Sequence, residues 1–155
     1  MDYFPCAVLL TNGDERDCVY FVEATSYIRA WVVWPDDDPG KREIRVEEVA
    51  RIQPSASRLP VRFARKMYAA GECGMGYCPF TLDFADGTRQ PYCTGNLIDF
   101  PELPAGKSMR DVVAITPHEG RGEQTLGTQQ YSWCLFSASP KKSMIQRLWR
   151  ALRSN

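Results

Sequence analysis

Short apolar runs separated by turn-forming residues dominate the hydrophobic pattern of the chain. Residues 6–10 and 18–22 are two such runs on either side of Asn12-Gly13-Asp14, whose residue types favour the positive φ of a tight turn. Residues 80–84, in which apolar and polar side chains alternate, and residues 89–94 flank a similar Ala-Asp-Gly-Thr turn. Each pair of runs predicts a β-hairpin.

Further strands are expected where β-branched and aromatic residues gather. The run Trp31-Val32-Val33-Trp34 is one such candidate, and it ends at a proline- and aspartate-rich stretch, residues 35–41, that predicts a loop. The other strand candidates are residues 44–46, 49–52, 112–116 and 131–136. Five short strands in the first half are typical of an SH3-like or half-barrel unit, so the predicted fold class is mainly β (α+β).

Two segments have helical rather than strand periodicity. Apolar residues recur every three or four positions before Gly71, which predicts a helix over about residues 59–70, followed by a glycine-rich connector at residues 71–76. An amphipathic C-terminal helix is predicted over about residues 139–152. Its apolar face comprises Met144, Ile145, Leu148, Trp149 and Leu152.

Residues 112–121 have a fainter copy at residues 49–58. Both blocks keep valine, isoleucine, proline and arginine in the same register, and an acidic residue, Asp111 or Glu48, precedes each block. Since each block also follows a turn-centred pair of apolar runs, we interpret the chain as two related β-rich units. The predicted division is a first β unit (1–58), a linking helix and connector (59–76), a second β unit (77–138) and a basic C-terminal helix (139–155), with one shared core as the alternative.

Composition and charge exclude several classes of protein. The chain has 155 residues, of which 44% are apolar, and this is enough for a packed core. Nineteen basic residues balance nineteen acidic ones, so no global positive field attracts nucleic acid or an anionic membrane. No secretory signal pattern and no apolar run of about 20 residues is present. We therefore expect a cytoplasmic protein without a membrane span.

The candidate chemistry is sparse. The six cysteines are expected to stay reduced in the cytoplasm. Cys73, Cys78, Cys93 and His118, the only histidine, have the ligand types of a zinc site but lack the compact cysteine pairs of one. We keep them as an alternative and predict no metal and no cofactor. Because no phosphate loop, nucleophile elbow or His-Glu-x-x-His motif is present, no catalytic residue is assigned and no enzymatic activity is expected.

Regions of opposed charge favour a binding function instead. Asp36, Asp37 and Asp38 form an acidic rim suited to a basic partner. Residues 124–155 carry a charge of +5, because no acidic residue follows Glu123. The predicted C-terminal helix has three interpretations: it packs against its own domain, meets phosphate, or lies on a membrane or in a partner's groove.

We therefore predict a non-enzymatic binding or adaptor protein that recognises another protein through aromatic and charged loop surface. Tyr20 and Tyr27 are additional aromatic candidates, and at least one of the two tryptophans at 31 and 34 is expected in the core. The alternatives are a nucleic-acid-binding protein, which would use the basic residues of 58–66 and the tail, and a small thiol- or zinc-dependent protein. The candidate binding residues are Trp31, Trp34, Tyr92, Arg62, Arg65, Lys66, Lys141, Lys142, Arg147 and Arg150. The partner and the oligomeric state are left open.

Overall fold

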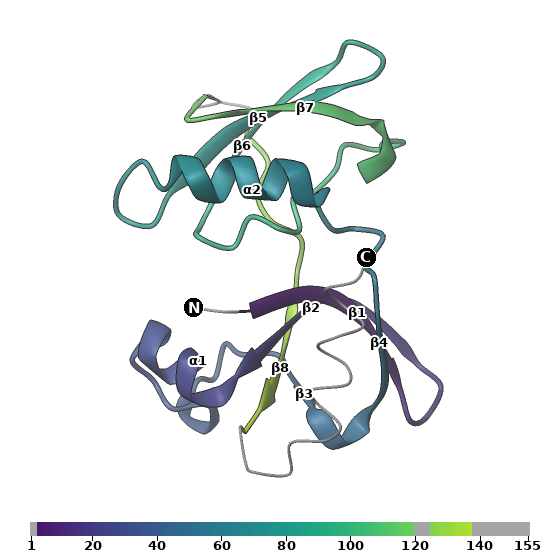
Figure 1. Ribbon diagram of the computed structural model, residues 1–155, viewed down its shortest axis with the longest axis vertical. Helices are drawn as coiled ribbons and strands as arrows, with labels where there is room; N and C mark the ends of the chain where they lie inside the picture. Colours follow the sequence, from purple (N-terminus) through teal and green to yellow (C-terminus); the bar gives the residue numbers. More distant parts are fainter. Residues whose placement is uncertain (1–2, 120–124, 138–155) are drawn as a thin grey trace. The chain divides into compact units, whose positions relative to one another are not determined.

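The computed structural model describes residues 3–119 and 125–137 (Figure 1). The chain is mainly β, and its described residues divide into two compact units, one made of residues 3–54 and 131–137 and the other of residues 55–119 and 125–130. A curled half-barrel sheet forms the first unit and a smaller sheet the second. The helix predicted at 139–152 lies outside the described residues.

The first unit has a mixed, five-stranded sheet. Its strand order is β3-β8-β2-β1-β4, in which β8 pairs parallel with both of its neighbours and the other pairs are antiparallel. The predicted hairpin is confirmed as β1 and β2. In chain order the elements are β1 (Tyr3–Leu10), β2 (Glu15–Glu23), α1 (Ala24–Trp31), η1 (Pro35–Asp37), β3 (Glu43–Arg45), η2 (Val46–Glu48), β4 (Val49–Gln53) and β8 (Ser132–Phe136), where η denotes a one-turn 3-10 helix.

The last strand lies in a different sheet from the one expected. Residues 131–136 had been assigned to the second β unit, but β8 lies between β3 and β2 of the first unit. Residues Trp133 to Phe136 are all buried, as expected of a central strand with both faces covered. Parallel pairing requires a long connection and leaves no turn signal beside the strand, so the local sequence gives no sign of its partner.

Alternation along β2 and β8 separates two layers of core. Val19, Phe21 and Cys134 point to one face, in a cluster completed by Cys6, Val8, Ile44 and Phe136. Tyr20 and Trp133 point to the other face, where their rings lie 5.3 Å apart. Helix α1 packs on this second, aromatic face, since the Tyr27 ring meets the Trp133 ring edge to face at 5.1 Å.

The strand predicted at Trp31-Val32-Val33-Trp34 is wrong. Trp31 is the last residue of α1, and Val32 ends the helix in the left-handed conformation. At the other end, the Glu23 side chain accepts a hydrogen bond of 2.9 Å from the backbone N–H of Ser26. The residue types favour a strand, but Tyr27 and Trp31, four positions apart on one helical face, both contact the Trp133 ring. This tertiary packing outweighs the local propensity.

The second unit packs one helix on a three-stranded antiparallel sheet (Figure 1). The strand order is β6-β5-β7, and the predicted second hairpin is confirmed as β5 and β6. Helix α2 confirms the helix predicted at 59–70, and it buries Phe63, Ala64 and Met67 against the sheet. The elements are α2 (Val61–Ala70), β5 (Cys78–Phe84), β6 (Arg89–Thr94), η3 (Met109–Asp111) and β7 (Val112–Pro117).

The two hairpin turns have the same hydrogen bonds. In the first, the Asn12 side chain accepts from the backbone N–H of Asp14 at 3.0 Å, and in the second Asp86 accepts from Thr88 at 3.0 Å. Glycine follows each acceptor, with φ of +90° and +84°, a conformation that favours glycine. Common descent of the two units stays a prediction.

The two blocks that look alike in sequence also begin alike in structure. Each forms a strand, β4 or β7, that follows a 3-10 helix and pairs antiparallel with the first strand of its hairpin. The carbonyl of the preceding acidic residue accepts a 2.8 Å hydrogen bond from the turn: Glu48 from Thr11, and Asp111 from Ala85. In each unit this hydrogen bond therefore joins the end of the 3-10 helix, from which β4 or β7 begins, to the turn of the hairpin.

Candidate functional site

Exposed apolar side chains gather where α1 ends. Trp31, Val32 and Trp34 are 45%, 89% and 66% exposed, and they make up three of the eight large hydrophobic residues exposed in the described ranges. Single exposed hydrophobic side chains need no explanation, whereas two indoles and a valine exposed within four positions mark a candidate binding surface. Asp36 and Asp37, both exposed, follow in η1. We name these five residues the tryptophan surface.

Aromatic packing supports the tryptophan surface from beneath. The Trp31 ring lies 6.2 Å from the ring of Trp133 and 6.3 Å from that of Tyr27. Trp133 in turn packs on Tyr20, which is fully buried. The chain of rings therefore continues from the core of the sheet to an indole that is nearly half exposed, and it restricts the orientation of that indole.

A partly buried hydrogen bond fixes the loop that carries Trp34. The hydroxyl of Tyr27 in α1 donates to a carboxylate oxygen of Asp38 at 2.5 Å, and the other carboxylate oxygen accepts from the N–H of Gly40 at 3.2 Å. The backbone N–H of Asp37 also donates to the carbonyl of Trp34 at 2.9 Å. Burial, followed by the neighbouring Asp38 carboxylate, raises the pKa of Tyr27 well above its usual range, so its hydroxyl remains a donor.

Val32 has a strained backbone. Its φ is +58°, in the left-handed region where a β-branched residue is a genuine outlier and where glycine commonly ends a helix. Its N–H donates to the carbonyl of Ile28 at 2.8 Å, so the residue performs the capping role of such a glycine. A strained residue with an almost fully exposed apolar side chain gives no packing benefit in return, which is typical of a functional position.

Of the aromatic candidates, only the two tryptophans are exposed. Trp31 and Trp34 both reach solvent, contrary to the expectation that one would be in the core. Tyr92 was predicted to be a binding residue, but its exposed fraction is 0% and its ring stacks on Phe80 at 5.0 Å. Tyr92 is therefore part of the second unit's core. Tyr20 and Tyr27 are buried as well.

The basic candidates of α2 do not form one free cationic patch. Lys66 donates to the backbone carbonyl of Ile115 at 2.6 Å, and Arg62 lies over the ring of Phe63 at 4.4 Å. Arg65 is exposed. The remaining basic candidates, Lys141, Lys142, Arg147 and Arg150, lie outside the described residues.

Arg58 belongs to a polar cluster around the buried carboxylate of Asp99 that sequence reasoning missed. Its Nε lies 3.9 Å from a carboxylate oxygen of Asp99, and the other oxygen accepts from the hydroxyl of Tyr68 at 2.5 Å. Asp99 is almost fully buried, and this burial raises the pKa of its carboxyl group. The cluster ties α2 to the loop before Pro101. The only sequence signal for the burial of this carboxylate is the apolar run around Asp99.

The structure does not assemble the alternative zinc ligands. Among residues 3–119 and 125–137, no three histidine, cysteine or acidic side chains are placed to hold a metal ion. Cys78 is buried and Cys93 is exposed. Cys93 pairs with Pro79, the residue after Cys78, so the two cysteine side chains point to opposite faces of the sheet. His118 is exposed with φ of +63°, and its Nε2 donates to the carbonyl of Gly71 at 3.0 Å.

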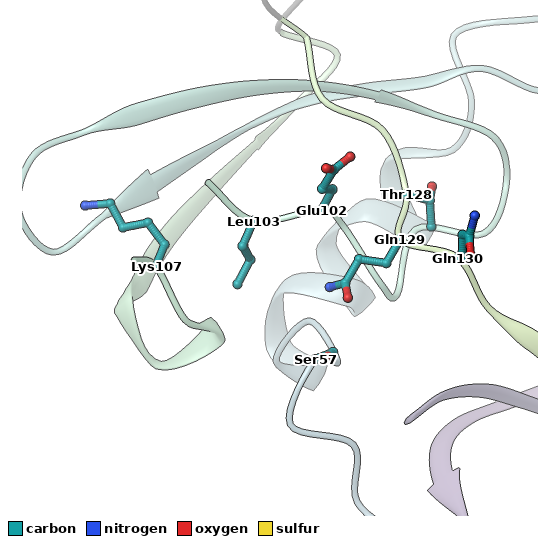
Figure 2. Close-up of a pocket in the computed structure, with 7 residues that line it drawn as sticks. All are labelled: Ser57, Glu102, Leu103, Lys107, Thr128, Gln129 and Gln130. Carbon is teal, nitrogen blue, oxygen red and sulfur yellow. The ribbon is translucent and has the colours of Figure 1, made fainter. Parts of the chain in front are cut away.

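The second unit also has an open polar pocket, which the sequence gave no reason to expect (Figure 2). Its volume is about 720 Å³. The side chains with polar groups are partly committed: Lys107 pairs with Asp86, and Gln129 donates to the carbonyl of Pro101 at 3.0 Å. The lining residues are Ser57, Glu102, Leu103, Lys107, Thr128, Gln129 and Gln130. A pocket with so little apolar lining is poorly suited to a small organic ligand.

Comparisons with known proteins give no relative. No family model, no curated protein and no solved structure matches the chain. In the part of the chain that the structure describes, no helix is long and apolar enough to cross a membrane. The tryptophan surface is therefore interpreted from its own geometry and chemistry.

Proposed function

We propose that this is a binding protein without catalytic activity, and that its tryptophan surface takes a basic, amphipathic segment of another protein. The observation that carries the proposal is a pair of exposed indoles, Trp31 and Trp34, held by ring packing and a partly buried hydrogen bond beside the exposed carboxylates of Asp36 and Asp37. The description of the first unit as SH3-like and the cytoplasmic location remain predictions beside it.

The chemistry of the surface selects the partner. Exposed indole faces attract arginine and lysine side chains and also accept aliphatic groups, while the two aspartates disfavour an acidic segment. Tryptophan is among the residues most enriched at binding hot spots. Because Trp31 rests on Trp133 and the loop of Trp34 is tied to Tyr27, little conformational entropy is lost on binding.

Nucleic acid binding is the second candidate function, and it has less support because two of its basic residues are engaged within the chain. This hypothesis depends on the basic residues of 58–66 and on the tail. Arg58 pairs with Asp99 and Lys66 with a backbone carbonyl, which leaves Arg62 and Arg65 on the outer face of α2. Two cations give only a weak, salt-sensitive attraction for a polyphosphate.

A pair of matched peptides tests the proposed partner chemistry. The probe is a short synthetic helix of leucine, alanine, lysine and arginine, and its control replaces every lysine and arginine with glutamate. Calorimetric titration of the full chain should show binding of the basic peptide and no heat from the acidic one. Equal binding of both peptides, or of neither, would overturn the proposal.

A further inference from the structure

We propose that the chain's own C-terminal segment, residues 139–153, occupies the tryptophan surface when no partner is bound. The inference rests on the proposed function, because it concerns regulation of the same surface. Three independent observations support it: the distribution of charge along the chain, the position at which the described chain ends, and the residue types of the segment.

Charge is separated between the first unit and the C-terminal segment. Residues 1–54 contain six basic and eleven acidic residues, which gives −5. Residues 55–130 contain eight of each and are neutral, and residues 138–155 contain five basic residues and no acidic one, which gives +5. The segment is therefore complementary in charge to the unit that bears the tryptophan surface, and it has no such relation to the second unit.

The chain leaves the described structure beside the helix that bears the surface. Strand β8 runs parallel to β2, and Phe136 pairs with Glu23, the residue immediately before α1. Lys141 lies five positions after Phe136, and an extended chain spans at most about 17 Å over five positions. Helix α1 has eight residues, a length of about 12 Å. The segment can therefore reach Trp31 without any change in the sheet.

The residue types of the segment match the surface. Sequence periodicity predicts an amphipathic helix there, with Met144, Leu148 and Trp149 on the apolar face and basic residues around it. This face supplies apolar contacts for Trp31, Val32 and Trp34, while the basic side chains meet Asp36 and Asp37. A segment tethered by a short linker acts at an effective concentration of about 1 mM, so even a weak contact is populated and competes with an external partner.

The four tryptophans of the full chain provide the readout. Fluorine-labelled tryptophan gives one NMR signal per residue, assigned by Trp→Phe substitutions. In the double variant Arg147→Glu/Arg150→Glu and in the single variant Trp149→Ala, the signals of Trp31 and Trp34 should move and that of buried Trp133 should not. The matched control, Arg62→Glu/Arg65→Glu, alters charge on α2 and should leave all four signals in place. Spectra independent of protein concentration would show that the contact is within one chain.

Titration with the basic peptide separates this inference from the proposed function. Release of the segment should make Arg147→Glu/Arg150→Glu bind the peptide about 10-fold more tightly than the unsubstituted chain. If the signals of Trp31 and Trp34 do not respond to either tail variant, the inference is overturned, and equal peptide affinities would overturn it too. If no peptide binds any variant while the tail variants still move both signals, the segment contact stands and the external partner is the part that fails.

Discussion

The hydroxyl of Tyr27 donates a 2.5 Å hydrogen bond to Asp38. Tyr27 lies in the helix that ends with Trp31, and Asp38 closes the 3-10 turn that follows Trp34. One contact between residues eleven positions apart therefore holds two exposed indoles in a fixed relation. The binding surface depends on this partly buried pair, although neither residue belongs to the surface.

Substitution Tyr27→Phe should remove the bond and leave the ring packed on Trp133. We expect the free energy of unfolding of the first unit to fall by about 1–2 kcal/mol, because the acceptor is a carboxylate. Hydrogen exchange of residues 36–41 should accelerate, and the basic peptide should bind more weakly. Tyr68→Phe is the matched control, since it removes a tyrosine–aspartate bond of equal length in the second unit. If peptide affinity falls equally in both variants, Tyr27 has no special role.

Substitution Val32→Gly should stabilise the protein and weaken binding together. Glycine relieves the positive φ, a gain of about 1 kcal/mol at a left-handed helix cap. It also removes an almost fully exposed side chain from the tryptophan surface. Thermal unfolding and peptide titration of the same variant check the two effects. A variant that is more stable and binds as tightly as the unsubstituted chain would show that the valine side chain has no part in recognition.

Asp99 should make the stability of the second unit depend on pH. Burial raises the folded-state pKa of its carboxyl above the unfolded value. The stabilising effect of proton uptake is therefore fully present below the unfolded pKa and is lost as the pH rises through the folded one. The Asp99→Asn side chain is uncharged at every pH. The free energy of unfolding of this variant minus that of the unsubstituted chain should therefore be larger at pH 7 than at pH 4. Urea unfolding at the two pH values measures this, and a difference that does not change with pH would contradict the assignment.

Thiol reactivity should divide the six cysteines into two classes. Cys73 and Cys93 are exposed, and the other four are buried. Burial raises the pKa of Cys134 to about 12 and also raises that of Cys78, which suppresses their reactive thiolates. Ellman's reagent should therefore modify two thiols rapidly in the native chain and all six in denaturant. Rapid modification of four or more native thiols would contradict the described packing.

Local patterns predicted the elements whose formation depends on near neighbours. The hairpin around Gly13, the hairpin around Gly87 and the helix that buries Phe63 all follow from turn chemistry and periodicity. Helix α1 was missed, although Tyr27 and Trp31 already have helical spacing, because its last residues are typical of strands. Its formation depends on Trp133, about a hundred positions away in sequence.

The candidate site was predictable in residue type and not in geometry. Residues 31–38 were expected to supply aromatic binding residues and an acidic rim, with at least one of the two tryptophans in the core. The pairing of strands decides which aromatic side chains are exposed. Because β6 pairs with β5, Tyr92 is buried against Phe80. The hydrogen bonds that Asp38 and Asp99 accept join residues 11 and 31 positions apart. No pattern within a single element signals such partners.

The most direct measurement is the affinity of the basic peptide for Trp34→Ala, compared with Tyr77→Ala, which truncates an aromatic side chain of similar exposure in the second unit. The tryptophan surface as the site of binding predicts a loss of about 10-fold or more, about 1.4 kcal/mol, for Trp34→Ala and no change for Tyr77→Ala. Equal affinities for the two variants and the unsubstituted chain would contradict it.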